Sequence, residues 1–146
     1  MSDEQIVNMI RDSLKAMEEG DVEKGMSSWA EDGVWITADG TFQGKEEVKR
    51  YLTWMAATSK DMKITETGNG IMVQGDKAFV EHIISGTIKG KKVEVLAMCA
   101  WEFSDGKIQR ISTTMDRLSM AQQAAKGWLA RWFVNFIVRQ AEKGLR

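Results

Sequence analysis

The stretch that decides the fold runs from Gly20 to Tyr51 and reads GDVEKGMSSWAEDGVWITADGTFQGKEEVKRY. Gly20 suits the end of a helix, because glycine readily adopts the left-handed conformation found there. Asp21 can cap the next helix, which we predict to be short and to end at Trp29. Before this stretch, residues 3–19 carry apolar side chains at three- and four-residue spacings, which predicts an amphipathic helix.

The second half of the stretch predicts a hairpin followed by a third helix. Asp39-Gly40 is a two-residue turn signal, because a primed turn needs positive φ, and it joins predicted strands at 34–37 and 41–43. Residues 44–59 then carry an apolar stripe at helical spacing. Three helices and a hairpin in so short a segment suggest a small domain built around a pocket.

The pattern changes to long strands after the third predicted helix. Strands are predicted at 62–74, 77–88, 91–104 and 107–117, separated by Gly75-Asp76, Lys89-Gly90 and Asp105-Gly106. Such close turn signals predict an antiparallel meander. Gly68 and Gly70 inside the first of these strands indicate a bulge or a sharp bend. We therefore expect an α+β fold in which a cone-shaped, curved antiparallel sheet packs on three N-terminal helices.

Composition limits the class of protein. The 146 residues carry a net charge of −1, which argues against nucleic acid as a partner. Cys99 is the single cysteine, and no N-terminal signal segment is apparent, so a cytoplasmic location is expected. One histidine and one cysteine do not make a metal site, and the glycines match no phosphate-binding motif. We expect neither a metal nor a cofactor.

These elements resemble the nuclear transport factor 2-like superfamily, in particular its SnoaL-like and ketosteroid-isomerase-like branch. The resemblance rests on WAEDGV at 29–34, F-x-GKE at 42–46, WEF-x-DGKI at 101–108 and DRL at 116–118, and it covers residues 3 to about 123. It implies an apolar pocket between sheet and helices. It also implies a cyclase, isomerase or hydrolase of a hydrophobic substrate, or a related protein that only binds a ligand or serves as an assembly module.

The resemblance argues against the catalytic site of the steroid isomerases and in favour of that of the SnoaL-like cyclases. The tyrosine, base aspartate and second acid of the steroid isomerases fall on Ser13, Thr37 and Cys99, respectively. These replacements argue against that proton-transfer mechanism, although Asp39 lies two residues beyond Thr37. Asp116 matches the key aspartate of the SnoaL-like cyclases, so we predict it as the carboxylate base. It could instead cap the last helix or pair with a nearby arginine.

His82 is the only histidine and lies in a predicted strand, with mostly apolar residues on the same side. On the pocket side it could act as a general base near neutral pH, so it is the second catalytic candidate. On the outer side it could lie under the last helix or in a subunit interface. The apolar ligand pocket is predicted to be lined by Trp35, Trp54, Cys99 and Trp101.

The chain is expected to divide into a cone domain at 1–118 and an apolar segment at 119–146, with one long helix from Ser119 to about Gly144. The polar stripe of this helix spans only roughly 80° of the helical wheel, so more of its surface is apolar than contact with one globule requires. From Ser119 onward, five basic residues and one acidic residue give a charge of +4, whereas the rest of the chain carries −5.

The excess apolar surface of this helix must meet a second apolar body. That body could be another subunit, a membrane surface or the pocket itself. The narrow polar stripe favours burial in protein, so we expect a homodimer, with membrane contact as the less favoured alternative. The predicted interface consists of Trp128, Trp132, Phe133 and Phe136.

Overall fold

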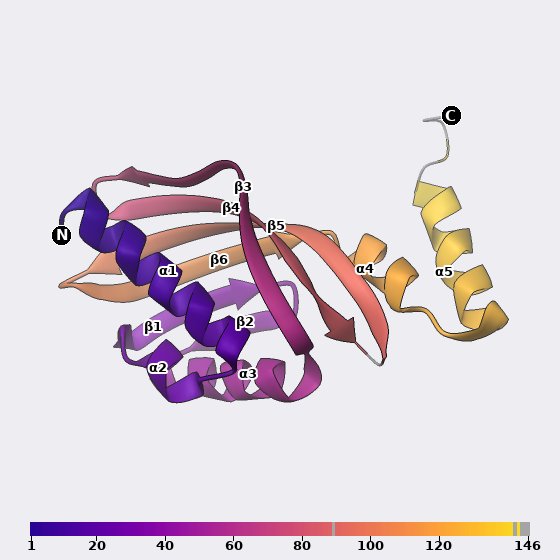
Figure 1. Ribbon diagram of the computed structural model, residues 1–146, viewed down its shortest axis with the longest axis horizontal. Coiled ribbons are helices and arrows are strands. Elements are labelled where there is room, and N and C mark those ends of the chain that lie inside the picture. Colours follow the sequence, from indigo (N-terminus) through magenta and orange to yellow (C-terminus); the bar gives the residue numbers. More distant parts are fainter. Residues whose placement is uncertain (89, 142, 144–146) are drawn as a thin grey trace.

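The computed structural model describes residues 1–88, 90–141 and 143. Its strands are β1 (Trp29–Thr37), β2 (Gly40–Gln43), β3 (Lys60–Gln74), β4 (Lys77–Ile88), β5 (Lys91–Ser104) and β6 (Lys107–Met115). Its helices are α1 (Asp3–Glu19), α2 (Val22–Met26), α3 (Lys45–Thr58), α4 (Arg117–Ala124) and α5 (Gly127–Ala141). The strands form one curved sheet in the order β2-β1-β6-β5-β4-β3, and α1, α2 and α3 lie along one of its faces (Figure 1). The expected α+β class and its antiparallel meander are confirmed.

Local signals place the N-terminal helices well. Ser2 and Gln5 form a capping box at the start of α1, and Gly20 ends the helix with φ 68°. The Asp21 carboxylate accepts a hydrogen bond from the backbone N–H of Lys24 at the start of α2. The predicted end of this helix at Trp29 is wrong. Helix α2 ends at Met26, and Trp29 instead opens β1, where its side chain is buried and its backbone pairs with β6.

The pairing of β1 with β6 is parallel, which the turn signals did not indicate. Trp35 pairs with Ile111 and Ile36 with Ser112, whereas every other neighbouring pair in the sheet is antiparallel. Parallel neighbours end at the same edge of a sheet. The turn that follows β1 therefore lies beside the start of α4, which follows β6.

A bulge bends β3 where the sequence indicated one. The register between β3 and β4 shifts between Glu66 and Ile71, and both intervening glycines have positive φ, 59° at Gly68 and 63° at Gly70. Non-glycine residues rarely adopt this conformation, so these glycines permit the bend. The bend curves the sheet around the N-terminal helices.

The core lies between the concave face of the sheet and helices α1 to α3. The indole rings of Trp29 and Trp35 stack with centroids 5.8 Å apart, and the rings of Trp101 and Phe103 stack at 6.3 Å. The apolar side of α1 closes over them, with Ile10 fully buried. Such large aromatic surfaces account for much of the buried apolar area of the domain.

The C-terminal segment does not form one continuous helix, as the sequence had suggested. Helix α4 ends with an extended residue, Ala125, and α5 begins at Gly127, where φ is 78°. Gln123 ties α4 to β5, because its amide both donates to and accepts from the backbone of Glu94, at 2.7 and 2.9 Å. Helix α5 then projects from the body beyond α4 (Figure 1). The expected helix end at Gly144 lies outside the described residues.

Candidate functional site

A cavity of about 500 Å³ lies between the concave face of the sheet and the helices α1 and α3. Strands β1 and β3 to β6 contribute to its wall, as does the beginning of α4. Most lining side chains are apolar. The described polar side chains in the wall are few and include Thr37, Asp39, Tyr51, His82 and Arg117. An apolar cavity with a few polar groups is the usual form of a small-molecule site.

The four side chains predicted to line a pocket all lie in the wall of this cavity. Trp35, Cys99 and Trp101 are buried at 4%, 5% and 1% exposure. Trp54 is 52% exposed and lies at the rim, where its ring stacks on Tyr51 with a centroid distance of 5.9 Å. Three of these residues therefore form the interior of the cavity, and Trp54 flanks its opening.

A hydrogen-bonded group spans the floor of the cavity from β1 to β5. The Nε1–H of Trp35 donates to Oγ1 of Thr113 at 3.0 Å, and the same oxygen lies 3.2 Å from Sγ of Cys99. Burial raises the pKa of the Cys99 thiol to about 11, while its hydrogen bond with Thr113 opposes the shift. The thiol is therefore protonated near neutral pH and acts as part of an apolar wall rather than as a nucleophile.

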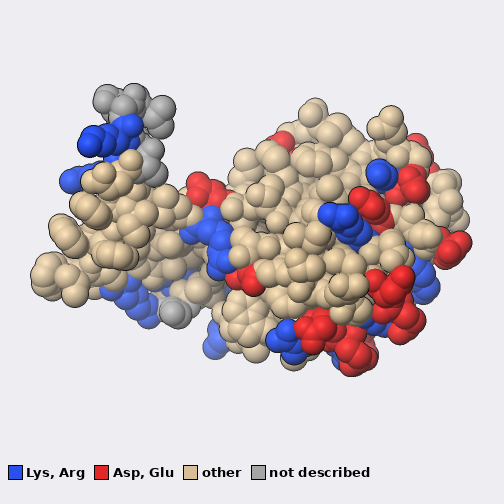
Figure 2. All heavy atoms as spheres, turned by 180° about the vertical axis from the view of Figure 1, so that it is seen from behind, with Lys and Arg blue, Asp and Glu red and all other residues tan. Residues whose placement is uncertain are grey.

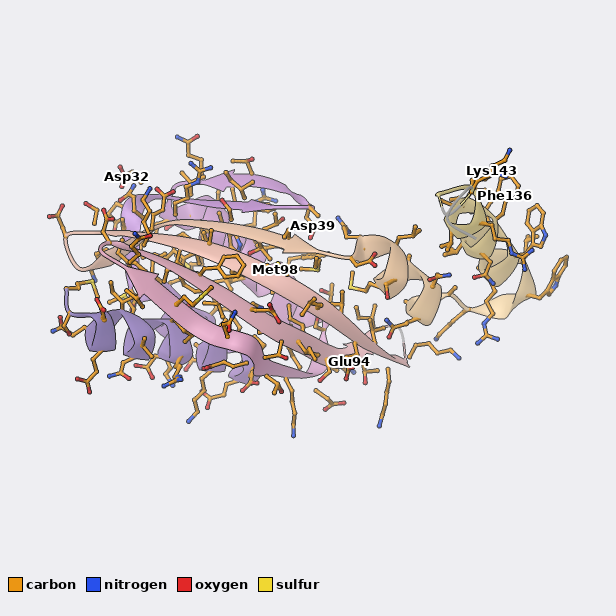
Figure 3. All side chains as sticks on the ribbon, turned by 90° about the horizontal axis from the view of Figure 1, so that it is seen from above. Asp32, Asp39, Glu94, Met98, Phe136 and Lys143 are labelled. Atoms are coloured by element: carbon orange, nitrogen blue, oxygen red, sulfur yellow. The ribbon has the colours of Figure 1, made fainter. Side chains whose placement is uncertain are left out.

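The charged groups of the cavity meet at its rim. The Tyr51 hydroxyl donates to Oδ2 of Asp39 at 3.0 Å, and Nη1 of Arg117 lies 2.8 Å from Oδ1 of the same carboxylate. Arg117 also donates to the backbone oxygen of Ala38 at 3.0 Å, which holds the guanidinium against this turn. Figure 3 shows Asp39 at the end of the sheet nearest α4, with Asp32 at the opposite end.

Tyr51 is the most enclosed member of this rim cluster. Its ring stacks on Phe42 at 4.2 Å and meets the edge of Trp35 at 5.2 Å, leaving the residue 6% exposed. Desolvation raises the pKa of Tyr51 to about 12, while a hydrogen bond with Thr37 opposes the shift. The phenol therefore remains neutral and can donate a hydrogen bond over the whole physiological pH range.

His82 lies on the cavity side of β4, which resolves the alternatives that the sequence left open. It is 1% exposed, and its Nδ1 has no hydrogen-bond partner among the described residues. Burial lowers the pKa of His82, whereas the nearby carboxylate of Glu66 opposes the shift. Glu66 is itself held by the guanidinium of Arg11 at 2.8 Å. The imidazole is therefore neutral near pH 7 and available as a polar group in an apolar wall.

Asp116, the predicted base, is not brought to the cavity wall. It is exposed at the N-terminus of α4, where its Oδ1 accepts the backbone N–H of Ser119 at 2.9 Å. The cavity is lined instead by Ile111, Thr113 and Met115, the residues of opposite parity on β6. Alternate residues of a strand point to opposite faces, so Asp116 shares its side with the outward-facing residues. The capping role, weighed as the alternative, is the one seen in the structure.

Sequence reasoning missed two members of the rim cluster. Tyr51 lies within the apolar stripe predicted for residues 44–59, and Arg117 is an arginine next to Asp116 that the sequence offers as a possible partner for that residue. Tyr51 lies outside the quoted motifs, and the DRL motif that contains Arg117 does not indicate its partner, because the cluster exists only once β1 and β6 have paired. Asp39 carried a weak signal, since it lies two residues beyond the position of the isomerase base.

The aromatic residues predicted as an oligomer interface all lie on α5. Trp128, Trp132, Phe133 and Phe136 are between 48% and 79% exposed. In the part of the chain that the structure describes, no helix is both long and apolar enough to cross a membrane. The same part contains no cluster of acidic, histidine or cysteine side chains arranged to hold a metal ion.

Several solved structures share this fold. A protein from Jannaschia sp. CCS1, named as a SnoaL-like polyketide cyclase, has a TM-score of 0.76 and 13% identity, over 87% of this chain and 98% of its own. A hypothetical protein from Catenulispora acidiphila DSM 44928 with a ketosteroid isomerase-like fold, in complex with trimethylamine, has a TM-score of 0.74 and 20% identity, over 85% and 95%. An LEH-like epoxide hydrolase from M. tuberculosis has a TM-score of 0.71 and 17% identity, over 92% and 96%.

Sequence comparison is more specific about the family. No curated protein matches the chain. The model of the SnoaL-like domain, however, matches residues 10–111, which include the C-terminal part of α1, all of α2 and α3, strands β1 to β5 and the first part of β6. This range also contains the greater part of the cavity wall. The chain therefore belongs to the family of SnoaL-like domains.

Proposed function

We propose that the protein binds an apolar small molecule in the cavity and transfers a proton on it, with Asp39 as the carboxylate base. The observation that carries this proposal is the meeting of one carboxylate with a phenol and a guanidinium at the rim of an otherwise apolar cavity. Members of the same fold named as a cyclase and a hydrolase support a reaction of this general kind. No cofactor is needed for the chemistry proposed.

The size and lining of the cavity suit a compact hydrophobic ligand. Its volume of about 500 Å³ lies within the range of small-molecule sites. Trp35 and Trp101 offer flat apolar surfaces against which a ring can pack. A polar substituent would be placed at the rim, since the charged groups lie there. We therefore expect an apolar substrate with one carbonyl group directed towards Asp39.

The three rim residues would have distinct roles. Asp39 would take a proton from the carbon beside the carbonyl group, forming an O–H bond, while the C–H electron pair becomes the C=C bond of the enolate and the C=O π pair moves to the oxygen. Once protonated, Asp39 is a weaker acceptor for the Tyr51 hydroxyl, which could then donate to the negative enolate oxygen. Arg117 would orient the carboxylate, and its positive charge would stabilise the negative charge that develops on the enolate oxygen.

His82 remains a second candidate, at a different depth in the cavity. Its buried, neutral imidazole could accept a proton from a ligand or orient its polar end.

Cys99, a buried free thiol, suits a reducing compartment such as the cytoplasm, which is the location we propose.

Binding without turnover is the alternative function. It is favoured by one observation: both oxygens of Asp39 are already engaged, Oδ2 by a hydrogen bond from Tyr51 and Oδ1 by an ion pair with Arg117. In that case the three residues would serve to close the rim and orient a ligand. The replacements at Ser13 and Thr37, relative to the steroid isomerases, agree with this alternative.

Proton abstraction can be tested without knowing the natural substrate. We would follow incorporation of solvent deuterium beside the carbonyl group of 2-tetralone, a compact apolar ketone, by NMR in D₂O. The wild-type protein should accelerate exchange, and Asp39→Asn should lower that rate by roughly 10²- to 10⁴-fold, the usual contribution of a general base. Asp116→Asn is the matched control, because asparagine preserves the helix cap outside the cavity.

The outcomes separate the two functions. A saturable change in the NMR signals of the Trp residues on addition of 2-tetralone, without deuterium exchange, would support a binding protein and remove the catalytic role of Asp39. Loss of exchange in Asp116→Asn, with Asp39→Asn unaffected, would return the base to the residue predicted from sequence.

A further inference from the structure

Helix α5 presents its apolar side away from the rest of the molecule. Six large apolar side chains on it are between 40% and 79% exposed: Trp128, Leu129, Trp132, Phe133, Phe136 and Ile137. The helix has 15 residues and is therefore roughly 22 Å long. Figure 1 shows it standing clear of the sheet, beyond α4. So much exposed apolar surface on one element indicates an interaction site.

A hydrogen bond joins α5 to its own domain. Nε2 of Gln122 on α4 donates to Oδ1 of Asn135 at 3.2 Å. Asn135 belongs to the narrow polar stripe of α5, together with Arg131 and Arg139, which lie four residues to either side. This contact joins α5 to α4, although Asn135, Arg131 and Arg139 remain exposed, and within residues 127–140 only Val134 and Val138 are half-buried. The domain therefore leaves the large apolar side chains of α5 uncovered.

The charged residues of the segment that forms α4 and α5 are basic. Between residues 117 and 141 the charged residues are Arg117, Lys126, Arg131 and Arg139, with no aspartate or glutamate. Lys91, on β5, lies beside Trp128 and Arg131 around an open hollow between β5 and α5. On the face shown in Figure 2, the described residues of the projecting segment show basic side chains, and most acidic side chains gather at the other end.

We propose that α5 docks the protein on the surface of an anionic lipid membrane. The helix would lie in the plane of the interface, with its aromatic residues at the boundary between headgroups and acyl chains. The long, exposed side chains of Lys126, Arg131 and Arg139 would reach lipid phosphates, while Asn135 keeps its contact with α4. Trp128 and Trp132 suit this position, since tryptophan is enriched at membrane interfaces.

A second copy of the chain fits this surface less well. Outside α5, the large apolar side chains that are exposed in the described residues are Met1, Trp54, Met72 and Leu96, which lie on separate elements. A second copy would therefore have to offer its own α5, which carries the same positive charge. Pairing two such helices brings like charges together and covers only one side of each. Lipid can surround a wide apolar arc and supplies the opposite charge.

Vesicle flotation with the full chain tests the proposal. Vesicles of phosphatidylcholine mixed with phosphatidylglycerol should carry the protein, and vesicles of phosphatidylcholine alone should carry far less. Replacing both Arg131 and Arg139 by glutamine should weaken binding to the anionic vesicles roughly 30-fold. Each basic residue near such a surface contributes roughly fivefold to the affinity, and two are removed. Trp132→Ser with Phe136→Ser should weaken it at least about tenfold.

Met72→Ser with Leu96→Ser is the matched control, because it removes two exposed apolar side chains elsewhere and should leave vesicle binding unchanged. Far-ultraviolet circular dichroism and the thermal midpoint would show that each variant is folded. Native mass spectrometry without lipid tests the alternative, in which a second copy of the chain covers α5. Absence of vesicle binding by the wild-type protein would overturn the proposal, as would a stable dimer that dissociates in the Trp132/Phe136 variant and does not bind lipid.

Discussion

The carboxylate of Asp39 and the guanidinium of Arg117 lie 2.8 Å apart, although one follows β1 and the other follows β6. They meet because β1 and β6 run parallel and therefore end at the same edge of the sheet. Tyr51, from α3, reaches the other oxygen of the same carboxylate at 3.0 Å. Three separate segments of the chain thus converge on one carboxylate at the rim of the cavity.

Arg117→Gln tests whether this ion pair positions the base. We expect deuterium exchange on 2-tetralone to fall roughly 10- to 100-fold, because the carboxylate would lose the partner that holds its Oδ1. The free energy of unfolding should change by about 1 kcal/mol or less, since both side chains are partly exposed, 47% for Arg117 and 28% for Asp39. Arg110→Gln, on the exposed side of β6, is the control. An equal loss of activity in both variants would contradict a specific role for Arg117.

Tyr51 is the only tyrosine, so its ionisation can be followed directly by absorbance. Desolvation raises its pKa to about 12 in the folded protein, compared with ~10 in an unfolded chain. The stability that this difference contributes is fully present below pH ~10 and is lost as the pH rises through about 12. The absorbance midpoint should therefore lie well above ~10, and it should return to ~10 in denaturant. A midpoint near ~10 in the folded protein would show that the phenol is exposed to water.

We expect the buried His82 to make the protein less stable to unfolding in mild acid. Burial lowers its pKa in the folded state, so the unfolded chain takes up a proton first as the pH falls below ~6.5. The stability contributed by the neutral imidazole is therefore present above pH ~6.5 and declines below it, by at most ~1.4 kcal/mol per pH unit.

Urea unfolding at pH ~7 and ~5 measures this effect, with His82→Leu as the comparison. The variant should lose much less stability between the two values, because leucine does not titrate. The Glu66 carboxylate, whose pKa is lowered mainly by its hydrogen bond from Arg11, titrates below this window. An identical decline in both proteins would assign the acid sensitivity to groups other than His82.

Gly33 is required for space rather than for conformation. A Cβ atom at this position would lie 2.8 Å from Cε3 of Trp29 and 3.1 Å from the backbone oxygen of Ala30. Gly33→Ala should therefore reduce the free energy of unfolding by about 2–3 kcal/mol, as in other overpacked cores. Gly75→Ala is the comparison, since it has φ 65° but nothing within 4 Å, and should cost about 1 kcal/mol. Chemical denaturation measures both, and a larger loss at Gly75 would contradict the tight contact at Trp29.

The elements of the fold follow largely from local sequence. Helix α1, the bend at Gly68 and Gly70, and the turns between the long strands were all predicted, because caps and turns depend on neighbouring residues. The errors arose where distant partners override local preference. Trp29 joins β1 rather than α2 because β6 offers it a backbone partner, Ile108, and a buried position.

The candidate site was predicted less well, for the same reason. Trp35 and Trp101 could be chosen as pocket residues because large aromatic side chains between turn signals suit a concave wall. The side of β6 that faces the cavity could not be chosen, since it depends on which strand pairs with it and in what register. A difference of one position separates Asp116, which caps α4, from Arg117, which reaches Asp39.

The amino-acid sequence by itself determined the order of helices and strands up to the end of β6, the SnoaL-like family and the unusual apolar character of the C-terminal segment. Tertiary structure alone decided that Asp39, Tyr51 and Arg117 share one site, and that the aromatic side chains of α5 are left exposed. The physical reason is the separation along the sequence over which each interaction acts. Capping and turn formation act between residues a few positions apart, whereas the site depends on a parallel strand pair that joins distant parts of the chain.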